Sequence, residues 1–223
     1  MSAIGFPCGQ PDSGIATANP KVRSLAERTI KRSIDFAGAL AGILFLSPLL
    51  IVPAVLVKLA DGGPFLYRRR VVGRNGEFDA YKLRTMRVDA DDVLRLNPQL
   101  RAEFEQSFKL RNDPRITRVG AVLRKYSLDE LPQLFNVLFG EMSLVGPRMI
   151  TAPELEKYGD RKNILRSVKP GLTGYWQVNG RQQTSYAERV AMETYYIENW
   201  SLLLDLKILF VTPARVLKGE GAY

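Results

Sequence analysis

The stretch IKRSIDFAGALAGILFLSPLLIVPAVLVKLADGGP, residues 30–64, decides the fold of this chain. No residue from Phe36 to Val57 is charged, and as one straight helix this run would reach about 33 Å, enough to cross a bilayer. Ser47-Pro48 falls near its centre, however, and an interior proline costs a helix about 3 kcal/mol. The half on each side of Ser47-Pro48 is only about 14–17 Å long, which is half a bilayer.

Both flanks of this apolar stretch are basic. Lys31 and Arg32 precede it, and Lys58 and the run 68–70 follow it. The positive-inside rule would hold both ends in the cytoplasm. A re-entrant helix–break–helix hairpin, which enters one leaflet and returns, satisfies both observations if its bend is hydrogen-bonded locally, for instance by the Ser47 hydroxyl. From these residues alone, the re-entrant hairpin and a kinked spanning helix are equally supported.

Composition restricts the chemistry. The chain has 223 residues, with 32 Lys and Arg against 23 Asp and Glu, and its net charge of +9 predicts an anionic partner such as lipid headgroups, nucleic acid or a phosphorylated substrate. It has no histidine, which excludes a Ser-His-Asp triad and a His-containing zinc site. Nucleophilic or acid–base chemistry therefore falls to carboxylates, Lys, Tyr or Ser.

We predict an α+β fold that is mostly helical. Its expected parts are a disordered tail (1–24), the re-entrant membrane hairpin (25–60) and a cytoplasmic domain (61–223) with small β-hairpin elements and membrane-interface helices. Asn75-Gly76 predicts a hairpin turn. The segment 185–217 mixes apolar, aromatic and basic residues, which fits either an amphipathic interfacial helix interrupted near Pro213 or an ordinary core helix.

Two adjacent carboxylates, Asp129 and Glu130, lie in YSLDELPQL, residues 126–134. As structure, Ser127 and Glu130 match a capping box ahead of a helix that Pro132 begins, and for an arbitrary sequence this interpretation would be favoured. As chemistry, the start of that helix would place phosphate-attracting N–H groups beside two carboxylates.

Cations flank this pair in the sequence. Arg124 precedes it and Arg148 follows it. A carboxylate beside guanidinium groups stays ionised, so such a pair can hold a divalent cation or attack phosphorus while arginines take up the charge of the transition state. Lys82 and Arg84 share one face of an extended segment and could together hold a phosphate, although a solvated edge strand explains them better by itself.

Four stretches strengthen the chemical interpretation, because they occur together in one order: YKLRTM (81–86), NDPRITRVGAVLRKYS (112–127), YSLDELPQLFNVLFGEMSLVGPRM (126–149) and KPGLTGYWQVNGR (169–181). They strongly resemble the bacterial sugar transferase family, the monotopic polyprenyl-phosphate phosphoglycosyl transferases that start exopolysaccharide, O-antigen and glycoprotein glycan assembly. The resemblance runs from about Ile30 to Leu217 and is greatest for the exopolysaccharide-production branch.

This resemblance implies a mechanism. Asp129 would attack the β-phosphate of a UDP-sugar, releasing UMP and forming a phosphosugar ester, and undecaprenyl phosphate would then take the phosphosugar. Mg²⁺ would neutralise diphosphate charge at Asp129 and Glu130, and Glu130 would aid metal binding or proton handling. The family's re-entrant helix is broken at a Ser-Pro, here Ser47-Pro48, which favours the hairpin over the spanning helix.

The resemblance also implies further sites and partners. Lys82, Arg124 and Arg148 fall where the family has phosphate-contacting cations, Arg181 matches a region linked to nucleotide binding, and Asp205 matches a position to which we assign no role. The expected location is the cytoplasmic face of a bacterial inner membrane. The expected partners are anionic lipids and downstream glycosyltransferases, with no nucleic acid. The sugar (galactose, glucose or an N-acetylated sugar) and a homodimeric state are left open.

Two other functions stand as alternatives. A membrane-tethered basic scaffold or nucleic-acid-binding protein would interleave aromatic residues with Lys and Arg and would not need Asp129. A membrane phosphatase or hydrolase would use the same aspartyl chemistry with water as the acceptor. The basic residues instead surround turns, glycines and the acidic pair, which favours the transferase over the scaffold.

Overall fold

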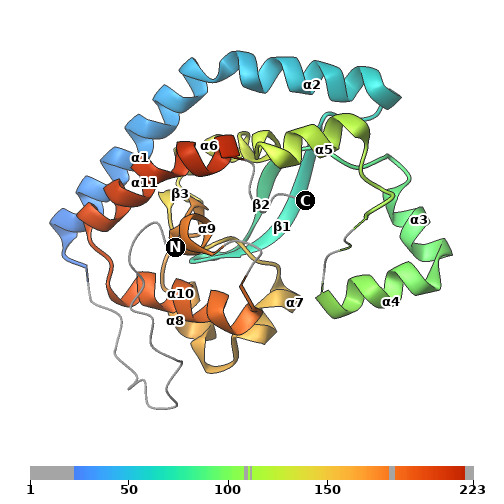
Figure 1. The fold of residues 1–223 in the computed structure, drawn as a ribbon. Helices are drawn as coiled ribbons and strands as arrows, with labels where there is room; N and C mark the ends of the chain where they lie inside the picture. The colour runs from blue at the N-terminus through green and yellow to red at the C-terminus, as the bar shows by residue number, and fades with distance from the viewer. Residues whose placement is uncertain (1–22, 108–109, 111, 181–183, 219–223) are drawn as a thin grey trace.

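The computed structural model describes residues 23–107, 110, 112–180 and 184–218. These residues form a mostly helical α+β fold, as predicted (Figure 1). Of its two small two-stranded sheets, β1–β2 is a predicted β-hairpin, whereas β3–β4 is a parallel pair that was not predicted. In chain order the elements, with η for a short 3-10 helix, are α1 (Leu25–Phe45), α2 (Ser47–Asp61), β1 (Leu66–Gly73), β2 (Gly76–Leu83), α3 (Ala90–Leu96), α4 (Pro98–Ser107), α5 (Arg118–Lys125), η1 (Leu128–Glu130), α6 (Gln133–Phe139), β3 (Ser143–Val145), α7 (Ala152–Leu155), η2 (Glu156–Arg161), α8 (Lys162–Arg166), β4 (Gly171–Thr173), α9 (Tyr175–Asn179), α10 (Tyr186–Glu198) and α11 (Leu202–Lys218).

Helices α1 and α2 are bent by 60° at the predicted break. Pro48 has no N–H with which to continue the helix, and the Oγ atom of Ser47 donates instead to the carbonyl of Leu44 at 2.9 Å. Within the described ranges, no single helix is both long and apolar enough to cross a membrane. Helices α1 and α2 taken together have the length and composition to do so. Most of the predicted tail lies outside the described residues; of its last two positions, Ser24 caps α1 and Arg23 stacks on Trp200.

One face of α1 packs against α6 and β3. Small residues allow this close approach, because a Cβ atom at Gly38 would lie 2.6 Å from Leu144 Cδ1 and one at Gly42 would lie 3.1 Å from Leu134 Cδ1. The opposite face exposes large apolar side chains, and α2 continues this exposed surface. The exposed large apolar residues of the two helices are Leu25, Ile30, Phe36, Leu40, Leu44, Phe45, Leu49, Ile51, Val52, Val55, Leu56 and Leu59.

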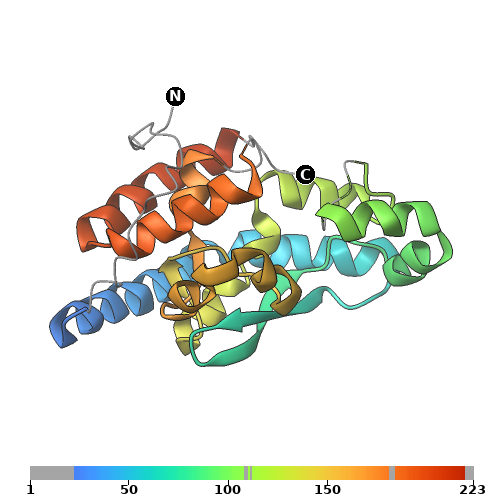
Figure 2. The ribbon, with the colours of Figure 1, turned by 90° about the horizontal axis from the view of Figure 1, so that it is seen from below.

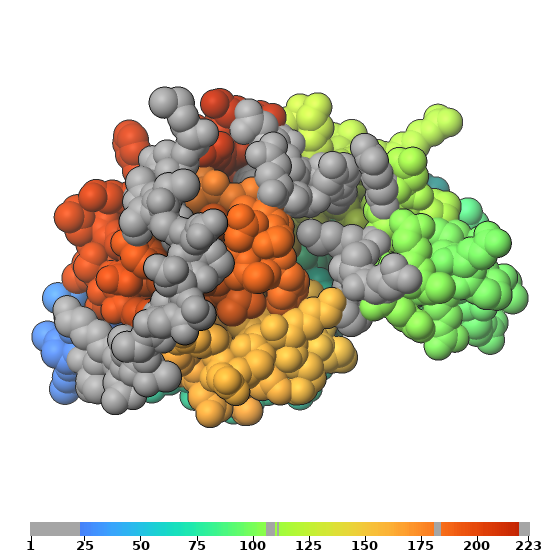
Figure 3. Space-filling view, turned by 60° about the horizontal axis from the view of Figure 1, so that its bottom comes forward, coloured from blue at the N-terminus to red at the C-terminus, as the bar shows by residue number. Residues whose placement is uncertain are grey.

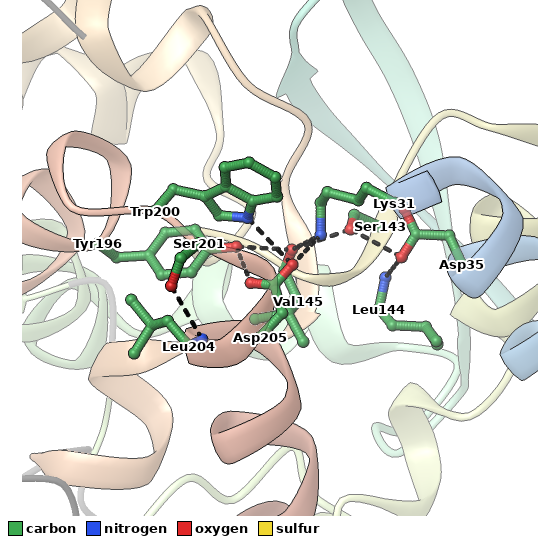
Figure 4. Close-up of polar contacts among 10 residues, drawn as sticks. All are labelled: Lys31, Asp35, Ser143, Leu144, Val145, Tyr196, Trp200, Ser201, Leu204 and Asp205. Atoms are coloured by element: carbon green, nitrogen blue, oxygen red, sulfur yellow. Dashed lines mark hydrogen bonds and ion pairs between the residues drawn. The ribbon is translucent and has the colours of Figure 1, made fainter. Parts of the chain in front are cut away.

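Polar side chains in the first half of α1 fix it to the rest of the molecule. Asp35 is buried and accepts hydrogen bonds from the Ser143 hydroxyl and the Leu144 N–H, both at 2.9 Å (Figure 4). Arg32 donates to the carbonyls of Val137 and Leu138 at 2.7 Å. These carbonyls belong to the last turn of α6, where a cation is favoured. Helix α1 is therefore joined to the rest of the molecule by buried polar contacts as well as by apolar packing.

Asp205 is the centre of a second polar cluster, also drawn in Figure 4. Its carboxylate accepts from Lys31 Nζ at 2.6 Å, from the Tyr196 hydroxyl at 2.7 Å and from Trp200 Nε1 at 3.1 Å. Lys31 also donates to the carbonyl of Val145 at 3.1 Å. Asp205, for which the sequence analysis leaves the role open, thus ties α1, α10 and α11 together. Helix α11 lies beside α1 in Figures 1 and 2.

The β1–β2 hairpin pairs from Leu66 with Leu83 to Gly73 with Gly76. Its two-residue turn is therefore Arg74-Asn75, one position earlier than predicted, and Gly76 follows with a φ of +119°. Asn136 of α6 is fully buried and holds strand β2. It accepts from the Tyr81 N–H at 2.9 Å and donates to the Asp79 carbonyl at 2.8 Å. This contact places Lys82, the next residue of β2, beside η1.

The C-terminal segment differs from its prediction. It breaks between Glu198 and Leu202 rather than near Pro213, which lies inside α11. Helix α10 is mainly a core helix, whereas α11 buries Ile208 and exposes Leu203, Leu206, Phe210 and Leu217. Helices α3 and α4 form one end of the molecule (green in Figure 3), away from the N-terminal part of α1.

Candidate active site

The Asp129-Glu130 pair lies on a tight turn. Ser127 has a φ of 53°, which is the single positive φ of a non-glycine residue among those described. It makes no side-chain capping bond, so the predicted capping box is wrong. The strained turn instead starts η1, and α6 begins at Gln133, one residue later than predicted. Because Ser127 and Glu130 do not form a capping box, the presence of two adjacent acids at this turn requires another explanation.

A small apolar cluster packs against this turn. Val57 of α2, Leu83 of β2 and Leu123 of α5 are buried together, and Leu128 of η1 packs against them. Since Leu128 directly precedes Asp129, this packing fixes the backbone of the acidic pair. It also ties the second half of the bent helix pair to the site.

Glu130 is held by two cations. Lys82 Nζ lies 2.7 Å from its Oε1 atom. Arg148 donates to both carboxylate oxygens, with Nη2 at 2.9 Å from Oε1 and Nη1 at 3.4 Å from Oε2. Burial alone would raise the pKa of Glu130, but the charges and hydrogen bonds of Arg148 and Lys82 hold it well below its usual value. Glu130 is therefore an ionised carboxylate with its oxygens already engaged.

Asp129 differs from Glu130 in its contacts and in the direction of its pKa shift. Its side chain is only 7% exposed, yet it accepts no hydrogen bond from any residue in the described ranges. Burial raises the pKa of Asp129 and the neighbouring charge of Glu130 raises it further, while Lys82, Arg124 and Arg148 pull it down. The charges of Lys82 and Arg148 thus hold the pKa of Glu130 below its usual value, whereas burial keeps the pKa of Asp129 above its own usual value despite the same cations.

Arg124 reaches the site from α5. Its Nε atom donates to the Thr85 hydroxyl at 2.9 Å, and burial lowers its pKa although the charge of Asp129 opposes this. Helix α5 can approach so closely because a Cβ atom at Gly120 would lie 2.0 Å from the carbonyl oxygen of Thr85. No local pattern indicates that Thr85 orients Arg124, since the two residues are 39 positions apart.

Arg148 follows strand β3, which pairs in parallel with β4. The loop between β3 and Arg148 packs backbone against backbone, because a Cβ atom at Gly171 would lie 2.1 Å from the nitrogen of Gly146. Gly171 also donates to the carbonyl of Pro147 at 2.8 Å. The motifs GPRM and KPGLTG therefore belong to one unit that sets the backbone position of Arg148.

The structure does not bring Arg84 to this site. Strand β2 ends at Leu83, and the Arg84 side chain turns to pair with Asp61 at the end of α2. It also donates to the carbonyls of Pro64 at 2.6 Å and Met86 at 3.0 Å. The predicted pair of cations on one strand face is therefore separated. Of Lys82 and Arg84, only Lys82 contacts the acidic pair, through Glu130. Arg181 lies outside the described residues.

A metal ion would have few protein ligands here. Across the described ranges, no group of three His, Cys, Asp or Glu side chains is arranged to hold one. Mg²⁺ needs only one or two carboxylates when substrate phosphates supply other ligands. Asp129 fits that requirement, because its oxygens accept no bond from described residues, whereas Glu130 is engaged by Lys82 and Arg148.

One further residue near the site was not predicted. Glu193 of α10 is 1% exposed and accepts from the backbone N–H of Arg148 at 3.1 Å. The i, i+4 spacing of Arg189 and Glu193 was visible in the sequence, but it indicates a surface helix pair rather than a buried contact with a loop 45 positions away.

Comparison with known proteins identifies the family. A model of the bacterial sugar transferases matches residues 26–219. The exopolysaccharide production protein ExoY of Rhizobium meliloti is 48% identical over 198 residues, which cover 86% of this chain and 88% of that protein. The UDP-galactose-lipid carrier transferase of Erwinia amylovora is 48% identical over 203 residues, and the undecaprenyl-phosphate galactose phosphotransferase of Salmonella typhimurium is 47% identical over 203.

The match differs in extent between these relatives. It covers 89% of this chain but only 42% of the Erwinia and Salmonella proteins, so this chain spans less than half of their length. In every case the matched part is long enough to include the acidic pair and its cations. Together, the family match and the site geometry show that the chain belongs to the bacterial sugar transferase family.

Proposed function

We propose that this protein moves a sugar 1-phosphate from a UDP-sugar to undecaprenyl phosphate through a covalent intermediate on Asp129. One observation carries the proposal. Of two adjacent buried carboxylates, Glu130 is fixed by Lys82 and Arg148, whereas Asp129 has oxygens that no described residue occupies. A nucleophile needs a free lone pair and nearby positive charge for the transition state, and Asp129 has both.

In the first step, a carboxylate oxygen of Asp129 bonds to the β-phosphorus of the donor. The bond from that phosphorus to the bridging oxygen breaks, and UMP leaves with the electron pair. In the second step, a phosphate oxygen of the lipid bonds to the same phosphorus and the Asp129 carboxylate leaves. The product is a lipid diphosphate that carries the sugar. Splitting the transfer in this way lets a soluble donor and a membrane acceptor react in turn.

The cations have separate parts in this mechanism. Arg124 lies deep in the site with only its Nε atom hydrogen-bonded in the described residues, so its terminal nitrogens can bind donor phosphate. Lys82 and Arg148 are held in place by Glu130 and add positive charge beside Asp129. Glu130 thus acts through the two cations that it positions. Mg²⁺, when bound through the diphosphate with Asp129 as its protein ligand, would neutralise the charge of the leaving UMP.

We further propose that the bent pair α1–α2 enters one leaflet of the bacterial inner membrane and returns. Its outer face and that of α11 expose large apolar side chains, and basic residues lie at both ends of the pair. The catalytic turn would then sit at the cytoplasmic surface, where the phosphate of the lipid acceptor lies and where UDP-sugars are made. Anionic headgroups would meet the basic flanks, and downstream glycosyltransferases would extend the product into a polysaccharide.

The names of the relatives suggest the donor to test first. Two of them are named as transferases of galactose or galactose phosphate, and one as an exopolysaccharide production protein. UDP-galactose is therefore our first candidate, ahead of UDP-glucose and the N-acetylated sugars.

The test is an assay with UDP-galactose labelled in the sugar, with and without undecaprenyl phosphate. Movement of label to the lipid phase together with UMP release supports the transferase. Label that appears only as free sugar phosphate would support the hydrolase, and no UMP from any UDP-sugar would support a non-enzymatic scaffold. With the donor alone, the peptide containing Asp129 should gain the mass of one sugar phosphate, and an unchanged mass would remove Asp129 as the nucleophile.

A further inference from the structure

We propose that Glu193 is a positioning residue for the transfer reaction, because it fixes the backbone of Arg148 and thereby the guanidinium that holds Glu130. This inference rests on the function proposed above. Glu193 lies on α10, far from the acidic pair in the sequence, and it contacts the backbone of Arg148 rather than the acidic pair itself.

The contacts of Glu193 use both of its oxygens. Oε1 accepts from the Arg148 N–H at 3.1 Å and from Arg189 Nε at 3.3 Å, and Oε2 accepts from the Tyr158 hydroxyl. Glu193 and Tyr158 are 1% and 4% exposed, respectively. A carboxylate at such a place is costly unless it is fully hydrogen-bonded, and here each partner comes from a different segment of the chain.

Arg189 completes the buried network. Its guanidinium carbon lies 4.6 Å from the ring centroid of Trp176 and 5.4 Å from that of Tyr186. Its Nη2 atom is buried, and no group among the described residues hydrogen-bonds to it. Arg189 is therefore a counter-charge for Glu193 that packs against aromatic rings, and its Nε atom shares Oε1 of Glu193 with the backbone N–H of Arg148.

The consequence for the site follows from the position of Arg148. Its backbone N–H is bound by Glu193, and its guanidinium is bound by both oxygens of Glu130. The residue is thus fixed at both ends, with the reacting carboxylate of Asp129 next to Glu130. Since misplacing a catalytic group by about 1 Å can cost about 100-fold in rate, a loose Arg148 backbone should slow the chemistry.

The first experiment measures the Arg148 backbone directly and needs no activity. In hydrogen–deuterium exchange of the full-length protein in lipid nanodiscs, a peptide covering residues 146–150 should exchange faster in Glu193→Leu than in the wild type. Glu193→Gln should retain slow exchange, because its amide oxygen can still accept from the Arg148 N–H. Unchanged exchange in Glu193→Leu would overturn the proposal.

The second experiment measures UMP release. We expect Glu193→Leu to lower kcat about 100-fold while KM for UDP-galactose changes less than about 3-fold, because the loss falls on the transition state. Glu193→Gln should stay within about 5-fold of the wild type, since one hydrogen-bond acceptor is preserved. Equal losses in both variants, or a kcat for folded Glu193→Leu near that of the wild type, would overturn the proposal.

Glu198→Leu is the matched control. Glu198 lies on the same helix and pairs with Arg161 of η2 at 3.5 Å, so it also joins α10 to that segment, but it does not contact Arg148. This variant should change neither the exchange of residues 146–150 nor kcat. If the wild type itself releases no UMP from any UDP-sugar, the proposed function fails, whereas the exchange experiment still decides whether Glu193 holds Arg148.

Discussion

Lys82 Nζ lies 2.7 Å from Oε1 of Glu130, although the two residues are 48 positions apart in the chain. The contact joins the β1–β2 hairpin to the acidic turn and makes one of two adjacent carboxylates a fixed counter-ion. Its neighbour Asp129, in the same cationic surroundings, has oxygens that accept no hydrogen bond from the part of the chain that the structure describes. The division of roles between two acids of the same kind therefore comes from which of them the cations reach.

Replacing Asp129 with Asn should abolish turnover without unfolding the protein. Asn has nearly the same shape but cannot form the phosphoester bond. The stability that accompanies the raised pKa of Asp129 is present below the unfolded pKa and is lost as the pH rises through the folded pKa, so near pH 7 the neutral Asn should be at least as stable. UMP release and thermal unfolding of purified protein check this, with the exposed Asp160→Asn as control. Turnover above a few per cent of wild type would contradict the nucleophile assignment.

The pH dependence should follow Asp129. Because burial raises its pKa above the ordinary 3.8 and only the ionised form attacks, kcat/KM should rise with pH through a limb that lies above that value. Lys82 is the cation that lowers this pKa most, so Lys82→Met should move the limb to higher pH. Profiles of kcat/KM against pH for the wild type and Lys82→Met show the direction in which the limb shifts. A shift to lower pH in the variant would be incompatible with this electrostatic account.

Lys82→Met should also destabilise the fold. Glu130 would keep Arg148 but lose its other partner in a site where both side chains are largely buried, which should lower the free energy of unfolding by about 3 kcal/mol. Arg70→Met on the same hairpin is the control, because Arg70 pairs with Glu77 and Asp79 in solvent, where such pairs contribute at most about 1 kcal/mol. Equal losses of stability in detergent would show that the buried pair adds nothing special.

Pro48→Ala should straighten the bent helix pair. Ala restores the N–H that Pro48 lacks, so the carbonyl of Leu44 can accept a regular helical bond in place of the one from Ser47. We expect the native Cys8 and a single cysteine introduced at position 160 to be labelled from the cytoplasmic side in the wild type, and from opposite sides in the variant. Pro53→Ala, inside α2, is the control and should leave the labelling unchanged. The same labelling in Pro48→Ala and wild type would remove Pro48 as the determinant.

Features that depend on a few neighbouring residues were predictable from the sequence. The break at Ser47-Pro48 follows from a missing N–H, and the hairpin near Asn75 follows from turn preferences, with an error of one residue. The acidic pair was found in the same way, by its position before a proline. The capping box failed because Ser127 adopts a left-handed conformation that the tertiary packing of Leu128 supports and that no local pattern indicates.

The sequence by itself therefore determined where the chain bends, which residues carry charge and which two carboxylates stand together. Only the tertiary structure decided that Lys82 and not Arg84 reaches the acids, and that the oxygens of buried Asp129 accept no hydrogen bond from described residues. It also decided that Glu193 accepts from the backbone N–H of Arg148. The physical reason is the separation along the chain over which each interaction acts. Backbone hydrogen bonding and proline geometry act within a few residues, whereas burial and the partner of a charge are set by segments that meet only when the chain packs.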